Sequence, residues 1–149
     1  MKNQILLVAT LFIMSSAFSQ LSDPVKWSFT SKKVADGYEI HLKANVEKGW
    51  HIYSQYTSDE GPVPTSIRFN KNPLVTLVGK VKEVGKMETK MEPLFGVEVK
   101  QFNGAVDFVQ TVKVKGKGKT SMGGTIEFML CDDHRCLPPT KKNFTIALK

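Results

Sequence analysis

Cysteine is nearly absent from this chain. Among its 149 residues, only Cys131 and Cys136 carry a thiol. Any disulfide within the chain can therefore join only these two residues. Because they lie five positions apart, such a bridge cannot link distant strands across a core, and a domain of this length can be stable without one. The pair is therefore a candidate for chemistry as well as for stabilisation.

Long apolar runs are also lacking, with one exception near the N-terminus. The segment from Ile5 to Met14 is almost unbroken, but it has about half of the roughly 20 residues that a membrane-spanning helix needs. It follows the positively charged Lys2 and precedes Ala17 and Ser19, which have the spacing of a signal-peptidase site. We therefore expect a cleaved secretory signal peptide, with an uncleaved membrane anchor as the alternative.

The expected cut follows Ser19, so the signal peptide covers residues 1–19 and a single domain covers residues 20–149. No cysteine lies in the cleavage region, which argues against a lipoprotein anchor. No second apolar stretch is long enough to span a bilayer. The domain is then periplasmic or secreted, in a compartment where disulfides persist.

Acidic residues are the minority of the charged side chains. There are 14 of them against 21 lysines and arginines, and the formal net charge of +7 falls to +6 when Lys2 is removed. The densest basic run places a lysine at every second position, at Lys113, Lys115, Lys117 and Lys119. In a strand this spacing puts all four on one face. We expect a solvated face or a lysine-guarded edge, with an anionic partner or membrane surface as the alternative. No aromatic residues alternate with these lysines, so nucleic acid is not an expected partner.

Helical periodicity is scarce, and apolar residues recur instead with period two. This alternation is clear from Tyr38 to Val46, and turn signals such as Asp36-Gly37 separate the runs. The expected strands lie near 27–34, 38–46, 50–53, 66–69, 75–84, 102–114, 125–130 and 144–148. Residues 85–96 are expected to form an irregular loop, Asn103-Gly104 a hairpin turn, and Gly79 a bulge. Seven to nine short antiparallel strands predict an all-β, immunoglobulin-like sandwich, with a small barrel as the alternative.

The two cysteines flank a short polar segment that follows an expected strand. Pro138-Pro139 comes next and forces an extended exit. As a staple, a bridge around about six residues would contribute only about 2 kcal/mol. As a redox couple, it would supply both the thiol that attacks a partner disulfide and the thiol that resolves the mixed disulfide. His134 and Arg135 flank the pair and could stabilise a thiolate, whereas Asp132 and Asp133 oppose it. A structural disulfide in a binding or adaptor domain is the alternative.

A metal site and a hydrolase centre are weaker alternatives. Cys131, His134 and Cys136 could offer three ligands to copper or zinc, but zinc sites usually have four ligands in two separated pairs. A serine hydrolase lacks support because the sequence contains no G-x-S-x-G motif.

The chain resembles the N-terminal periplasmic domain of the DsbD thiol:disulfide interchange protein, the disulfide bond corrector domain family. Three stretches carry the resemblance: the cysteine segment with its Pro-Pro step at residues 131–140, the Gly-aromatic stretch at residues 48–54, and the Glu-Pro-Leu-Phe-Gly stretch at residues 92–96. The resemblance implies an immunoglobulin-like domain that relays electrons through its cysteine pair and requires no cofactor. It would act as a thiol:disulfide oxidoreductase of the protein-disulfide reductase type.

The resemblance also implies roles for single residues. Cys136 would attack and form mixed disulfides, and Cys131 would resolve them. His51 and Tyr53 would flank the pair, although an exposed histidine and a plain buried tyrosine are the alternatives. Leu94 or Phe95 would cap the sulfurs, whereas Met87 and Met91 are expected to serve packing.

This chain departs from the family pattern in several places. Its intercysteine loop has four residues, which is short for the family, His51 replaces a phenol, and Pro93 interrupts the acidic pattern of the cap. The sequence contains neither a membrane-embedded electron carrier nor a thioredoxin-like domain. The expected donor is therefore a separate thioredoxin-like or membrane-embedded reductase, and the expected acceptors are oxidised periplasmic proteins.

Overall fold

The computed structural model describes residues 23–149, which form nine strands and no helix. The strands are β1 (Val25–Val34), β2 (Gly37–Val46), β3 (His51–Tyr53), β4 (Ser66–Phe69), β5 (Val75–Glu92), β6 (Val97–Val114), β7 (Thr120–Phe128), β8 (Leu130–Cys131) and β9 (Thr140–Leu148). The expected signal peptide lies outside the described residues. Within them, no helix could cross a membrane.

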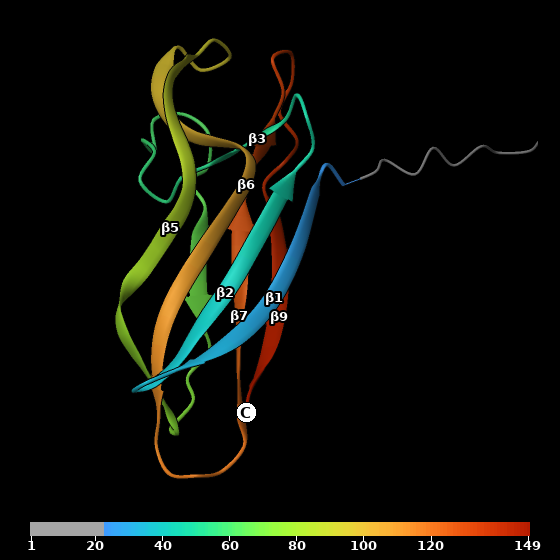
Figure 1. Cartoon of the computed structure of the whole chain (residues 1–149). Coiled ribbons are helices and arrows are strands. Elements are labelled where there is room, and N and C mark those ends of the chain that lie inside the picture. Colours follow the sequence, from blue (N-terminus) through green and yellow to red (C-terminus); the bar gives the residue numbers. More distant parts are fainter. Residues whose placement is uncertain (1–22) are drawn as a thin grey trace, which may run out of the picture.

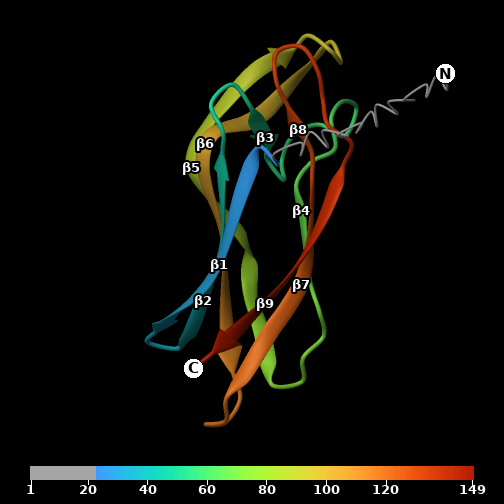
Figure 2. The ribbon, with the colours of Figure 1, turned by 90° about the vertical axis from the view of Figure 1, so that its right-hand side faces the viewer.

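Two antiparallel sheets face each other and form the immunoglobulin-like sandwich that the strand pattern predicts (Figures 1 and 2). The larger sheet has the order β1-β2-β6-β3-β8, and β5 pairs with β6 along its other edge. The smaller sheet has the order β4-β7-β9. The prediction of an all-β fold is therefore confirmed.

The core lies between the sheets and follows from the alternation along each strand. In β2, Ile40, Leu42 and Ala44 are fully buried, while the residues between them face outward. The opposite sheet contributes buried side chains from two strands, Met122, Ile126, Phe128, Phe144, Ile146 and Leu148. Trp27 connects the layers, with its ring 5.2 Å from that of Phe128 and 6.0 Å from that of Phe108.

Strands β5 and β6 differ most from the sequence prediction. The expected irregular loop at residues 85–96 is wrong, because β5 continues to Glu92 and pairs with β6 up to Val97. A tight turn closes this hairpin, in which the Glu92 carbonyl accepts a hydrogen bond from the Gly96 N–H at 2.8 Å, and Gly96 adopts a φ of 68°. Most side chains of residues 85–92 are exposed on both faces, so this second half of β5 has no apolar alternation to detect.

Two smaller predictions are also wrong. Asn103-Gly104 is not a hairpin turn but lies inside β6, opposite the register shift between Gly85 and Met87. The four lysines do not share one strand face. Strand β6 ends at Val114, so Lys115, Lys117 and Lys119 lie in the loop before β7. The bulge at Gly79 is confirmed by a register shift between Val78 and Lys82.

The sandwich has two distinct ends (Figures 1 and 2). Strands β3 and β8 and the tip of the β5–β6 hairpin gather at one end, together with both cysteines. The β1–β2 turn, the β4–β5 connection and the β6–β7 loop gather at the other.

Candidate functional site

Cys131 and Cys136 form a disulfide at the end of β8, and their Cα atoms are 4.0 Å apart. The backbone closes the same loop on both sides of the bridge. The Leu137 N–H donates to the Leu130 carbonyl at 2.8 Å, and the Asp132 N–H donates to the Arg135 carbonyl at 2.9 Å. The short polar excursion that the sequence predicts is therefore a narrow antiparallel turn.

The Asp132 side chain adds a second constraint on this turn. Its Oδ1 accepts hydrogen bonds from the N–H of His134 at 2.8 Å and of Arg135 at 2.7 Å. These hydrogen bonds stabilise the charged carboxylate and hold the pKa of Asp132 below its usual range. The bond from the His134 N–H has the largest effect. The Arg135 guanidinium also lies 5.5 Å from the centre of the Trp50 ring. The turn is thus held by contacts that do not require the disulfide.

The two cysteines differ in exposure. Cys131 is fully buried and packs against Tyr53 and Val99, whereas Cys136 is partly exposed at the edge of the same cluster. A molecule that approaches from solvent therefore reaches Cys136 first.

Strand β3 places two polar side chains beside the buried cysteine. His51 pairs directly with Cys131 across the strands, so the two Cβ atoms lie on the same face and close together. Tyr53 lies two residues further along and on that face too. Both are buried, with His51 6% exposed and Tyr53 0% exposed. The alternative of an exposed histidine is therefore wrong, whereas the burial of Tyr53 fits both alternatives, so a flanking role stays a prediction.

Glu92 from the end of β5 completes this buried group. Its Oε2 accepts a hydrogen bond from the Tyr53 hydroxyl at 2.8 Å and lies 3.2 Å from His51 Nε2. His51 Nε2 also lies 3.0 Å from the Tyr53 hydroxyl oxygen. Glu92 is only 4% exposed. We call His51, Tyr53 and Glu92 the polar cluster.

Burial sets the protonation of this cluster. It lowers the pKa of His51, although the hydrogen bond and charge of Glu92 oppose the shift. Burial, with the same carboxyl group as a second cause, raises the pKa of Tyr53. His51 also borders a cavity of about 480 Å³, lined in part by Trp50 and Gln101. A neutral imidazole and a neutral phenol therefore lie beside the buried cysteine.

The expected cap residues lie on the turn between β5 and β6. Leu94 is 48% exposed and Phe95 38% exposed. Phe95 lies beside Gly61, because a Cβ placed on that glycine would be 3.6 Å from the Phe95 Cβ. Val97, at the start of β6, packs against the cluster that contains Cys131. A capping role for Leu94 or Phe95 stays a prediction.

The remaining candidates are dispersed. His134 is exposed within the cysteine turn. Met87 and Met91 are 47% and 64% exposed, so the expectation that they serve packing is wrong. In residues 23–149, no three His, Cys, Asp or Glu side chains are grouped to hold a metal ion.

A family model described as the N-terminal part of the thiol:disulfide interchange protein DsbD matches residues 19–148. The chain belongs to the DsbD N-terminal domain family.

Two solved structures share the fold of this DsbD N-terminal domain. The reduced DsbD N-terminal domain of Neisseria meningitidis is 15% identical, with a TM-score of 0.54, and the match covers 81% of this chain and 84% of that one. The N-terminal periplasmic domain of ScsB from Proteus mirabilis is also 15% identical, with a TM-score of 0.53. That match covers 83% of this chain but 44% of the ScsB chain. No curated protein sequence matches the chain.

Glu92 is the member of this candidate site that sequence reasoning missed. The spacing of His51 and Tyr53 indicates a shared face. Nothing local shows that a glutamate 39 positions beyond Tyr53 reaches the tyrosine hydroxyl. The one sequence feature that included Glu92 was the family-like stretch at residues 92–96, and that stretch was interpreted as the cap over the sulfurs.

The lowered pKa of His51 predicts a pH dependence of stability. The unfolded chain binds a proton near the ordinary histidine pKa of about 6.5, and the folded chain binds it only at lower pH. Stability is therefore present above about pH 6.5 and is lost as pH falls toward the folded pKa. Urea unfolding between about pH 7.5 and 5 should show this loss, and His51→Gln should flatten it. An identical slope in both chains would contradict the assignment.

Proposed function

We propose that this domain is a thiol–disulfide interchange module that relays reducing equivalents through Cys131 and Cys136. The observation that carries the proposal is the bridge itself. In a chain of the DsbD N-terminal family, it places one buried and one partly exposed sulfur at the end of the sandwich. Thiol–disulfide exchange needs this asymmetry, because one sulfur must meet the partner and the other must stay available to resolve the intermediate.

In the proposed reaction, the reduced domain donates two electrons. The Cys136 thiolate attacks one sulfur of a partner disulfide, forms a mixed disulfide and releases the other partner sulfur as a thiolate that takes up a proton. The Cys131 thiolate then attacks the Cys136 Sγ, which closes the intramolecular bridge and releases the second partner thiol. The partner is reduced and the domain is oxidised.

A dithiol donor restores the domain by the same steps in reverse. Its thiolate attacks the accessible Cys136 Sγ and displaces Cys131, and its second thiol then releases reduced Cys136. We assign the donor role to a thioredoxin-like or membrane-embedded reductase in trans, and the acceptor role to oxidised exported proteins. Both assignments rest on the family resemblance, and the periplasmic location rests on that resemblance together with the expected signal peptide and its cut after Ser19. The P. mirabilis relative is likewise described as periplasmic.

The reduction potential of the pair tests this proposal. Equilibration in glutathione or dithiothreitol buffers, with the free thiols trapped by alkylation, should give a value of roughly −200 to −270 mV, within reach of thioredoxin-like partners. A value below about −300 mV would identify a structural bridge instead. The domain would then be a binding or adaptor module.

A further inference from the structure

The end of the sandwich opposite the disulfide concentrates the positive charge of the chain. We call it the distal end and define it by residues 33–38, 70–75, 114–120 and 148–149. Hydrogen bonds hold two of these segments together. The Lys115 N–H donates to the Leu74 carbonyl at 2.8 Å, and the Asn72 side-chain amide donates to the Ser121 carbonyl. The distal end contains six lysines, Lys33, Lys71, Lys115, Lys117, Lys119 and Lys149. Its single acidic side chain is Asp36.

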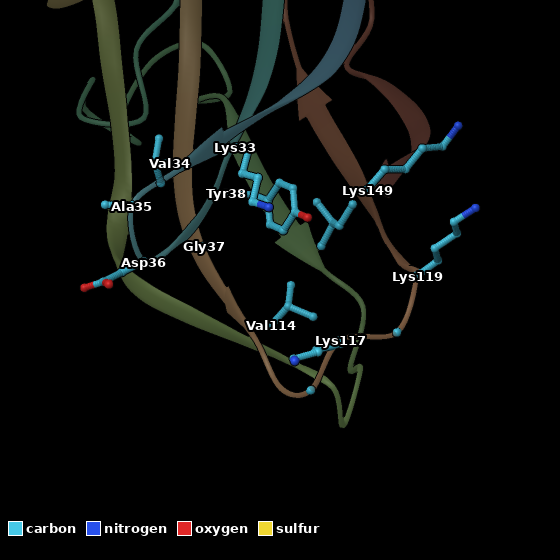
Figure 3. A pocket seen from close by; sticks show the side chains of 13 residues that line it. Lys33, Val34, Ala35, Asp36, Gly37, Tyr38, Val114, Lys117, Lys119 and Lys149 are labelled. Atoms are coloured by element: carbon cyan, nitrogen blue, oxygen red, sulfur yellow. The ribbon is translucent and has the colours of Figure 1, made fainter.

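A pocket of about 460 Å³ opens between three of these segments, residues 33–38, 114–119 and 148–149 (Figure 3). Apolar side chains, among them Val114 and Leu148, line it together with Tyr38. Figure 3 shows Lys119 and Lys149 extending outward in a similar direction, away from the other lining side chains. The ammonium groups therefore do not converge on one point, as a site for a single small anion would require. They present spread charge to a broad surface.

Exposed apolar residues accompany the lysines. Leu74 is 45% exposed and adjoins Lys115 through its backbone, and Leu77 is 43% exposed on the part of β5 that pairs with Val112. Lysines beside exposed aliphatic side chains suit a surface that is anionic outside and apolar beneath, which is the character of a membrane interface. An acidic protein would complement the same charge and is the other occupant that the competition experiment below tests.

From this placement we infer that the distal end binds an anionic phospholipid surface. Strand β6 has 18 residues and connects the two ends. With the distal end on the membrane, this strand would place the disulfide at the end of the domain that faces away from the lipid, roughly 55 Å or less from the headgroups. The redox pair then stays accessible to proteins in the aqueous compartment while the domain remains at the membrane. This inference does not rest on the proposed exchange activity.

Vesicle binding tests the inference with residues 20–149, because every strand of the sandwich lies between Val25 and Leu148. The probes are vesicles of equal parts phosphatidylglycerol and phosphatidylcholine, and vesicles of phosphatidylcholine alone. We expect sedimentation with the anionic vesicles only, and its loss when salt rises from about 0.1 M to about 1 M, because screening shortens the Debye length. Equal binding to both vesicle types, or to neither, would overturn the inference.

Matched variants separate the distal end from net charge. A lysine near an anionic surface contributes about fivefold in binding, so K115Q/K117Q/K119Q should weaken the partition by at least about tenfold. The control K43Q/K82Q/K86Q removes the same charge from exposed positions in the middle of the larger sheet and should weaken it by less than about threefold. Equal loss in both triple variants would overturn the inference, as would a melting temperature lowered only in the first.

Two competitors of vesicle binding test whether another ligand occupies the distal end. Inorganic phosphate should displace the protein from anionic vesicles no better than chloride at equal ionic strength. Stronger displacement would indicate a site for free phosphate. Polyglutamate should bind the domain more weakly than the vesicles do. Tighter binding would indicate an acidic protein partner, and either result would replace the lipid assignment.

Discussion

Cys136→Ala is expected to abolish disulfide exchange, whereas Cys131→Ala is expected to arrest it at the mixed disulfide. In the proposed reaction the partly exposed Cys136 would form the mixed disulfide, and only the buried Cys131 could then displace the partner from it. With oxidised protein disulfide isomerase as the acceptor, whose potential of about −180 mV lies above the range expected for the domain, the rate of thiol transfer from the reduced domain should fall by at least about 100-fold in Cys136→Ala. Cys131→Ala should accumulate a covalent adduct that is visible on a non-reducing gel.

The fold of both variants provides the control. A bridge around a loop this short contributes only about 2 kcal/mol, and backbone hydrogen bonds and Asp132 hold the same turn. Both variants should therefore keep the wild-type circular dichroism spectrum and a cooperative unfolding transition. Loss of the fold in either variant would favour a structural staple. If Cys136→Ala instead of Cys131→Ala accumulates the covalent adduct with the partner, Cys131 is the attacking cysteine and the assigned roles are reversed.

Glu92→Ala is expected to cause a large loss of stability. Glu92 lies within hydrogen-bonding distance of two buried side chains, the hydroxyl of Tyr53 at 2.8 Å and Nε2 of His51 at 3.2 Å. Alanine leaves both without this acceptor, although His51 is only 6% exposed and Tyr53 0% exposed. The expected cost is about 2–4 kcal/mol in the free energy of unfolding. Urea unfolding at constant pH measures it.

Two further variants test this explanation. Glu92→Gln keeps one side-chain oxygen as an acceptor and should cost less, about 1 kcal/mol. Glu88→Ala removes a glutamate from the surface of the same strand, where its partners are Lys90 and Asn103. That change should stay within about 0.5 kcal/mol of the wild type. Equal losses for Glu92→Ala and Glu88→Ala would show that the buried acceptor is not what stabilises the hairpin end.

The polar cluster shows why part of the site lay beyond sequence reasoning. His51 and Tyr53 could be placed on one face because side chains along a strand alternate with period two. The family resemblance implied that they lie close to the cysteines. Their burial and their contact with Glu92 depend on where β5 ends relative to β3. That relation is set by the long β5–β6 hairpin. Because most side chains of residues 85–92 are exposed on both faces, no apolar pattern marked this second half of the strand.

The sequence by itself determined the fold class, the single disulfide and the place of the redox candidate. Alternating apolar residues must bury one face of each strand, and two cysteines allow only one pairing. Tertiary structure alone decided which sulfur is accessible, which acid joins His51 and Tyr53, and how lysines from four separate segments gather at the distal end. Local patterns report the two faces of a strand, whereas contacts between residues far apart in the chain depend on how the strands are ordered and paired.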